Sequence, residues 1–165
     1  MRTTFLGAAL LVAGLALPVS AHAVTRHDPA DRGAADRAAA VHSRSTHWQD
    51  RVLELTNRRR HAHGVRPLKA GTCPDHFAET WTRHMALTHD FEHQSLTPFF
   101  KRCQGIHTAG ENIAYGYETP GALVSAWMHS KGHRENILNP HFHRIGVAGW
   151  RDSGGTTYAT QDFVG

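Results

Sequence analysis

The sequence predicts an α+β fold in which a small antiparallel sheet is covered by helices. Segments with helical spacing or helix-start signals dominate the first part of the folded region, and extended segments dominate its end. The last two extended segments flank Asp152-Ser153-Gly154-Gly155, a turn sequence typical of a hairpin. The order helices, strand, helix, hairpin favours helices packed on an antiparallel sheet.

The N-terminus has the parts of a secretory signal peptide, which we assign to residues 1–23. Arg2 supplies the positive start, Phe5 to Leu17 form the apolar run, and Ala21-His22-Ala23 has the small residues of a cleavage site. The apolar run is shorter than the roughly 20 residues that span a bilayer. No later segment approaches that length, so we expect a secreted, extracellular protein without a transmembrane segment.

Residues 24–45 are predicted to be a disordered leader. They are rich in Ala, Arg, Asp and Ser and show no sustained apolar stripe along a helix. The folded domain is then expected to cover residues 46–165, which is enough chain for one ordinary hydrophobic core.

Within this domain, apolar spacing predicts a first helix at about 47–62 and a second at about 74–88. A short third helix begins at Thr97-Pro98. A fourth begins at Glu118 or Thr119, because the following Pro120 is favoured in the first turn. Trp48, Trp81 and Trp127 lie in the predicted helices and are expected in the core.

Three extended segments predict the strands of the sheet. They cover residues 112–117, 144–150 and 156–163. The segment 133–140 is expected to be a turn in which Arg134 and Asn136 make buried hydrogen bonds.

Charge and composition argue against a dedicated nucleic-acid binder and favour other partners. The 18 Lys and Arg exceed the 14 Asp and Glu by a net +4, without one dominant basic block. Arg58 to Arg60 are expected to form a solvated helix face, or alternatively to attract anionic wall polymers weakly.

Cys73 and Cys103 are the two cysteines of the chain, so only one intramolecular pairing is possible. In an exported protein we expect them to form a disulfide. The alternative, a catalytic thiol, would leave the other cysteine idle in an oxidising compartment.

Several turn-rich polar segments resemble the CAP superfamily, named for cysteine-rich secretory proteins, antigen five and pathogenesis-related proteins and also called the SCP domain. The resemblance is greatest to its bacterial branch and covers about 50–163. It rests on four segments: Phe91-Glu92-His93, Ala109-Gly110-Glu111-Asn112-Ile113-Ala114, the run from Trp127 to Pro140, and Tyr158-Ala159-Thr160-Gln161-Asp162-Phe163.

The resemblance implies an α-β-α sandwich with a surface cavity that holds histidines and acids. Carried over by position, His93 and Glu111 match two cavity residues of the wider family. His133 is the histidine of the bacterial branch. The expected cavity set is therefore His93, Glu111 and His133, with the second acid unassigned.

Two imidazoles and one carboxylate in a cavity would suit a divalent cation such as zinc. The same groups could form an acid and base pair. Glu111 and Asn112 could instead be structural, through buried hydrogen bonds. His129, at helical spacing from His133, is expected on the surface.

Three classes of function follow from this set. The first is an extracellular binding or effector module that takes a lipid, a wall polymer such as a sugar chain, a protein or a cation without turning it over. The second is a metal-dependent extracellular hydrolase directed at peptides or the cell wall, with Glu111 and a histidine-bound metal activating water. The third is a purely structural secreted domain. The chain has no GxSxG, HExxH, CxxC or P-loop motif, so we place the binding module first.

Overall fold

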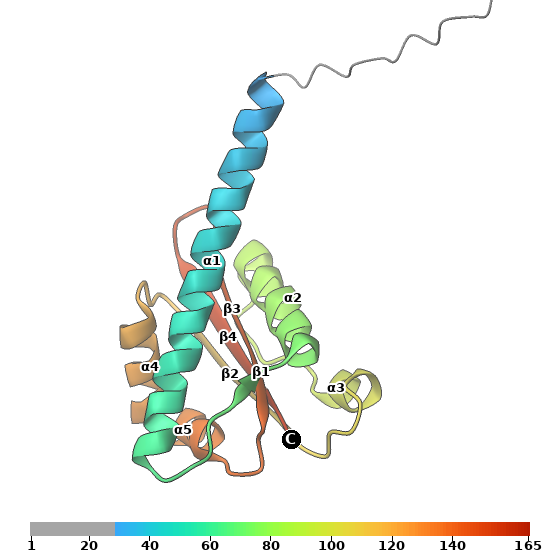
Figure 1. Ribbon diagram of the computed structural model, residues 1–165, viewed down its shortest axis with the longest axis vertical. Helices are drawn as coiled ribbons and strands as arrows, with labels where there is room; N and C mark the ends of the chain where they lie inside the picture. The colour runs from blue at the N-terminus through green and yellow to red at the C-terminus, as the bar shows by residue number, and fades with distance from the viewer. Residues whose placement is uncertain (1–28) are drawn as a thin grey trace, which may run out of the picture.

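Four strands form one sheet in the order β1-β3-β4-β2, as seen in a computed structural model that describes residues 29–165, with side chains from residue 46 (Figure 1). The strands are β1 (Lys69–Ala70), β2 (Ala109–Tyr115), β3 (Arg144–Arg151) and β4 (Thr157–Val164). β4 pairs antiparallel with both β2 and β3, and the short β1 adds to β3 in parallel. The predicted signal peptide, residues 1–23, lies outside the described residues.

Helices cover both faces of this sheet, which confirms the α+β fold and the α-β-α layering (Figure 1). One face carries α1 (Pro29–Ala62), α4 (Pro120–His129) and α5 (Lys131–Leu138). The other carries α2 (Thr72–Thr88) and the short α3 (Thr97–Arg102). In the part of the chain described here, no helix combines the length and apolar character needed to cross a membrane.

All eight residues of β4 are buried, because β4 lies between two strands and under helices on both faces. Successive side chains of a strand point to opposite faces. Phe163 accordingly joins the core under α1, α4 and α5, while Val164 joins the core under α2 and α3. One strand thus anchors both hydrophobic layers.

Two glycines of β3 let the helices approach the sheet closely. A Cβ on Gly146 would lie 2.2 Å from the backbone of Pro74 and Asp75 in α2. A Cβ on Gly149, on the opposite face, would lie 2.7 Å from the Trp48 ring in α1. Any side chain at either position would push a helix off the sheet.

The first helix begins earlier than the sequence predicted. α1 begins at Pro29, so residues 29–45, predicted as a disordered leader, are helical. Disorder was predicted because this segment lacks an apolar stripe along one helix face. Such a stripe shows whether a helix packs against a core, but a helix can also form without one. Ala and Arg both favour helices, and Pro is favoured in the first turn. In Figure 1 this part of α1 extends beyond the sheet.

The segment 133–140, predicted as a turn, is mainly helical and is a second correction. α4 ends at His129, and α5 follows over Lys131–Leu138. Ser130 separates them with an extended backbone, at φ −91° and ψ 126°. Gly132 lies exposed in the first turn of α5. β1 was not predicted, because two residues are too few to show an alternating pattern.

Cys73 and Cys103 form the predicted disulfide, with their Cα atoms 5.6 Å apart. The bond joins the beginning of α2 to the end of α3. Cys103 also packs with Phe77 and Phe99 in the core under these helices. The bridge therefore fixes α3 to the layer that carries α2.

Arg60 is buried, which corrects the prediction of a solvated face over Arg58 to Arg60. Its side chain has 0% exposure, whereas Arg58 and Arg59 are exposed. The Arg60 guanidinium donates to four backbone carbonyls at 2.7–3.2 Å, those of Arg66, Ile137, Asn139 and Phe142. Burial lowers the pKa of this group, and the charge of Arg66 lowers it further. Arg60 thus closes the C-terminal end of α5 against α1.

We expect Arg60→Ala to lower the free energy of unfolding by about 3–5 kcal/mol, because several buried carbonyls lose their donor. Arg59→Ala, at the neighbouring exposed position, should change it by less than about 0.5 kcal/mol. Urea unfolding followed by far-UV circular dichroism measures both. Equal stabilities of the two variants would contradict the role given to Arg60.

Candidate functional site

The pairing of β2 with β4 places two carboxyl groups side by side. Glu111 and Asp162 are partners in the register of these strands, and both side chains point to the α2 face of the sheet. Asp162 is completely buried, and the Glu111 side chain is nearly so. The sequence left the second cavity acid unassigned, and the acid that the structure places beside Glu111 is Asp162.

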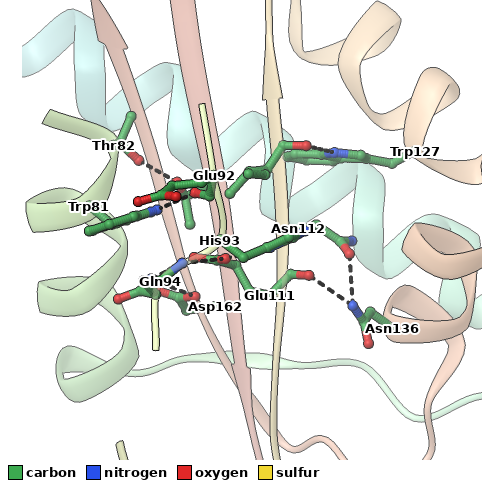
Figure 2. Close-up of polar contacts among 12 residues, drawn as sticks. Trp81, Thr82, Glu92, His93, Gln94, Glu111, Asn112, Trp127, Asn136 and Asp162 are labelled. Atoms are coloured by element: carbon green, nitrogen blue, oxygen red, sulfur yellow. Dashed lines mark hydrogen bonds and ion pairs between the residues drawn. The ribbon is translucent and has the colours of Figure 1, made fainter. Parts of the chain in front are cut away.

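Two residues between α2 and α3 cover this acid pair. Gln94 Nε2 donates to Glu111 Oε2 at 2.7 Å and to Asp162 Oδ2 at 3.0 Å, and its backbone N–H donates to Glu111 Oε1 at 3.2 Å. His93 Nδ1 lies 2.6 Å from Glu111 Oε1 (Figure 2). The Gln94 amide therefore bridges the two acids.

Burial dominates the ionisation of both acids. It raises the pKa of Glu111, although hydrogen bonds from Gln94 and His93 act in the opposite direction. It raises the pKa of Asp162 well above the usual range, and the neighbouring Glu111 raises it further. Two adjacent buried carboxyls disfavour double ionisation, so the pair favours retention of a proton on Asp162.

The chain that carries His93 and Gln94 is also fastened to α2. Trp81 Nε1, in α2, donates to the carbonyl oxygen of Glu92 at 2.9 Å (Figure 2). We call residues 91–94 the covering segment. It has no regular secondary structure, so its place over the acids depends on these side-chain contacts.

A cavity of about 670 Å³ opens beside the covering segment. His93 and His133 both line it, whereas Glu111 lies behind His93. Burial lowers the pKa of His133, and the nearby His93 lowers it further. The complete lining is Phe91, Glu92, His93, Ile113, Ala114, Tyr115, Tyr117 and His133.

Buried amides hold His133 and α5 against β2. Asn136 Nδ2 donates to the carbonyl oxygen of Glu111 and to Asn112 Oδ1, each at 2.9 Å. Asn112 Nδ2 donates to the carbonyl oxygen of His133 at 3.2 Å. These contacts confirm the structural interpretation of Asn112 and Asn136. Arg134 also matches its prediction, since it donates to the carbonyl oxygen of Met128 at 3.1 Å.

Comparison with known proteins decides the family. The family model of the cysteine-rich secretory protein family, CAP, matches residues 53–163. The chain belongs to the CAP family. This confirms the resemblance found in the sequence.

Two Bacillus subtilis (strain 168) proteins are similar to this CAP domain. YkwD is 44% identical over 124 residues, which are 72% of this chain and 47% of YkwD. The membrane protein YlbC is 32% identical over 122 residues, which are 70% of this chain and 34% of YlbC. The chain thus spans half or less of the length of these relatives.

Solved bacterial structures share the fold. An extracellular protein with an SCP domain from Bacillus anthracis has a TM-score of 0.64 and 27% identity, over 73% of this chain and 41% of its own. A Staphylococcus aureus cysteine-rich secretory protein has a TM-score of 0.62 and 25% identity, over 73% of this chain and 39% of its own. An outer surface protein from Borrelia burgdorferi has a TM-score of 0.61 and 19% identity, over 68% of this chain and 87% of its own. At that identity it shows the fold alone.

The side chains of this CAP domain do not fit a zinc ion held by His93, Glu111 and His133. Among the residues that the structure describes, no three His, Cys, Asp or Glu side chains are grouped as such a site requires. Both oxygens of Glu111 already accept hydrogen bonds from His93 or Gln94. A cation at Glu111 would have to compete with these contacts.

Sequence reasoning missed Gln94 and Asp162. Asp162 gave no periodic signal, because it ends a run of three polar residues, Thr160 to Asp162. Gln94 gave none either, since it lies in an irregular segment. His129 is exposed and bonds only its own helix, at Ser125, which matches its predicted place on the surface.

We expect Asp162→Asn to flatten the dependence of stability on pH. An acid whose folded-state pKa is raised loses stabilising free energy as the pH rises past its unfolded-state pKa, because the folded state holds on to the proton. The wild type should therefore lose stability from about pH 4 upward, and asparagine removes the Asp162 contribution. The variant should gain stability relative to the wild type as the pH approaches neutrality.

Urea midpoints across that pH range provide the measurement. Asp90→Asn, at an exposed acid near the covering segment, is the matched control and should retain the wild-type profile. Parallel pH profiles for Asp162→Asn and the wild type would show that the buried acid does not retain its proton.

Proposed function

We propose that the chain is a secreted, extracellular binding module whose cavity takes a ligand without turning it over. The observation that carries the proposal is the lining of the cavity. Exposed aromatic rings and two imidazoles surround it, while the nearest buried acid is already hydrogen-bonded. Such a mixture of apolar rings and a few polar groups is typical of ligand sites.

Three observations support export. The first residues have the pattern of a signal peptide. The domain contains a disulfide, which persists in oxidising compartments. A similar solved structure is that of an extracellular protein with an SCP domain from Bacillus anthracis. We therefore place the cavity in contact with the extracellular medium.

The bonding of Glu111 argues for binding over hydrolysis. A general base needs a carboxylate oxygen within reach of the water it activates. Here Gln94 and His93 occupy both oxygens of Glu111, and Asp162 lies beneath Gln94 with no exposed surface. The residues that line the described cavity also include no Ser, Thr or Cys that could act as a nucleophile.

The exposed rings argue against a purely structural domain. Phe91 is 44% exposed and Tyr115 is 54% exposed, and both lie at the cavity. Aromatic residues that only stabilised the fold would bury more of their surface. Their exposure is accounted for if the cavity receives a ligand.

A zinc titration tests whether the protein holds the metal that the hydrolase needs. The hydrolase requires zinc to raise the melting temperature near pH 7.5, equivalent to about 2.7 kcal/mol at a hundredfold excess over Kd. If the hydrolase were correct, that shift would be lost in His93→Ala and retained in His129→Ala. We expect no shift in the wild type or in either variant, because Glu111 is engaged in hydrogen bonds and the set of zinc ligands is incomplete.

Binding without turnover is tested with a panel of palmitate, oligosaccharides and peptides. We expect at least one class to raise the melting temperature, and mass spectrometry after prolonged incubation should recover it unchanged. His133→Ala, which alters the cavity wall, should reduce the shift, while His129→Ala should not. Recovery of cleaved products would replace the proposal by the hydrolase, and the absence of any shift would favour the structural domain.

A further inference from the structure

Exposed aromatic residues concentrate at the cavity. Among residues 46–165, six large apolar side chains are exposed, and three of them, Phe91, Tyr115 and Tyr117, line the cavity. Tyr117 is 37% exposed. We call these three residues the aromatic wall. They come from two separate segments, the covering segment and the end of β2, which the fold brings together at one opening.

Neighbouring rings hold Phe91 and Tyr115 of the aromatic wall in place. The Phe91 and Tyr115 rings meet edge to face, with centroids 4.7 Å apart. On its other side Tyr115 stacks on buried Tyr158 at 5.8 Å, with 24° between the planes. The Tyr158 hydroxyl in turn lies 3.3 Å from His89 Nδ1. Rings fixed in this way bind with less loss of side-chain entropy than free ones.

Polar groups share the cavity with these rings. His93, His133 and Glu92 line it, and Ile113 and Ala114 are its only aliphatic members in the described chain. A fatty chain is best received by an aliphatic wall without groups that need hydrogen bonds. A strongly anionic ligand would call for Lys or Arg, and the described lining contains neither.

Sugar rings match this combination of surfaces. A pyranose has an apolar face of C–H groups that packs on an aromatic ring, and an equatorial belt of hydroxyls that requires donors and acceptors. Imidazoles offer one donor and one acceptor when neutral. A carboxylate such as Glu92 accepts hydrogen bonds from hydroxyls. The lining supplies each of these groups without a Lys or Arg.

We propose that the aromatic wall, with His93 and His133, binds an uncharged carbohydrate chain built of pyranose rings. This inference rests on the proposed binding function and specifies its ligand class. The carbohydrate packs the C–H faces of its rings on Tyr115 and Phe91. Its hydroxyl groups donate hydrogen bonds toward the polar side of the cavity. No bond in the ligand is made or broken.

Isothermal titration of the purified secreted chain with chitotetraose and cellotetraose tests the proposal. We expect binding of at least one of them, and a loss of affinity of about tenfold in Tyr115→Ala and in Phe91→Ala, the loss typical of one missing aromatic contact. Tyr115→Phe should retain most of the affinity, because the ring is what packs on the sugar. Thermal melts confirm that each variant is folded.

Phe100→Ala is the matched control. Phe100 is also an exposed aromatic, 51% exposed, but it lies in α3 and does not line the cavity. Its replacement should leave the affinity unchanged. If Phe100→Ala weakens binding as much as Tyr115→Ala, or if Tyr115→Ala has no effect, the aromatic wall is not the sugar site.

Parallel titrations with palmitate separate failure of this inference from failure of the proposed function. Binding of palmitate alone, lost in Tyr115→Ala, would overturn the carbohydrate class and leave the binding module standing. If neither tetrasaccharide, nor palmitate, nor any peptide binds, both the carbohydrate inference and the proposed binding function are overturned. Shortened oligosaccharides after incubation would keep the carbohydrate class and replace binding by hydrolysis.

Discussion

The central strand β4 is buried along its whole length, yet it carries three polar side chains in succession. A buried polar group without a partner costs about 1–3 kcal/mol of stability, so each of Thr160, Gln161 and Asp162 needs a partner from an element that packs over it. Thr82 in α2 bonds Thr160 at 2.7 Å, and Thr56 in α1 bonds Gln161 at 2.7 Å. Both helix layers are thereby fixed in register with one strand.

Asp162 extends this constraint to the candidate site. Its partner is supplied by Gln94, which belongs to no helix or strand. Because the Gln94 amide also bonds Glu111, the covering segment is held at the edge of the sheet where β2 and α5 meet. Phe91, Glu92 and His93 consequently form one side of the cavity. The need to satisfy a buried acid thus determines where the cavity lies.

The same constraint separates the parts of the site by role. The buried layer, Glu111, Gln94 and Asp162, is linked by hydrogen bonds and serves to position the residues above it. The layer that faces solvent consists mainly of imidazoles and aromatic rings, together with the exposed residue Glu92. The hydrogen-bonded acids Glu111 and Asp162 thus lie beneath the residues that a ligand would contact, and Glu92 is the acid at the cavity itself. The binding function proposed for this CAP domain rests on that division.

Local sequence patterns were enough to predict most elements and the family. Spacing of apolar residues located the cores of α1, α2 and α4, and the turn at 152–155 between two extended segments located β3 and β4, because these patterns depend on local geometry. With two cysteines the disulfide had one solution, and the motifs around His93, Glu111 and His133 identified the CAP family and two cavity histidines.

The surroundings of these residues, in contrast, follow from the tertiary structure alone. Arg60 lies in a run of three arginines and Gln94 in an irregular segment, and nothing local distinguishes either from a solvated residue. Their partners lie 77 and 68 positions away, at Ile137 and Asp162, and such contacts exist only once the chain has folded.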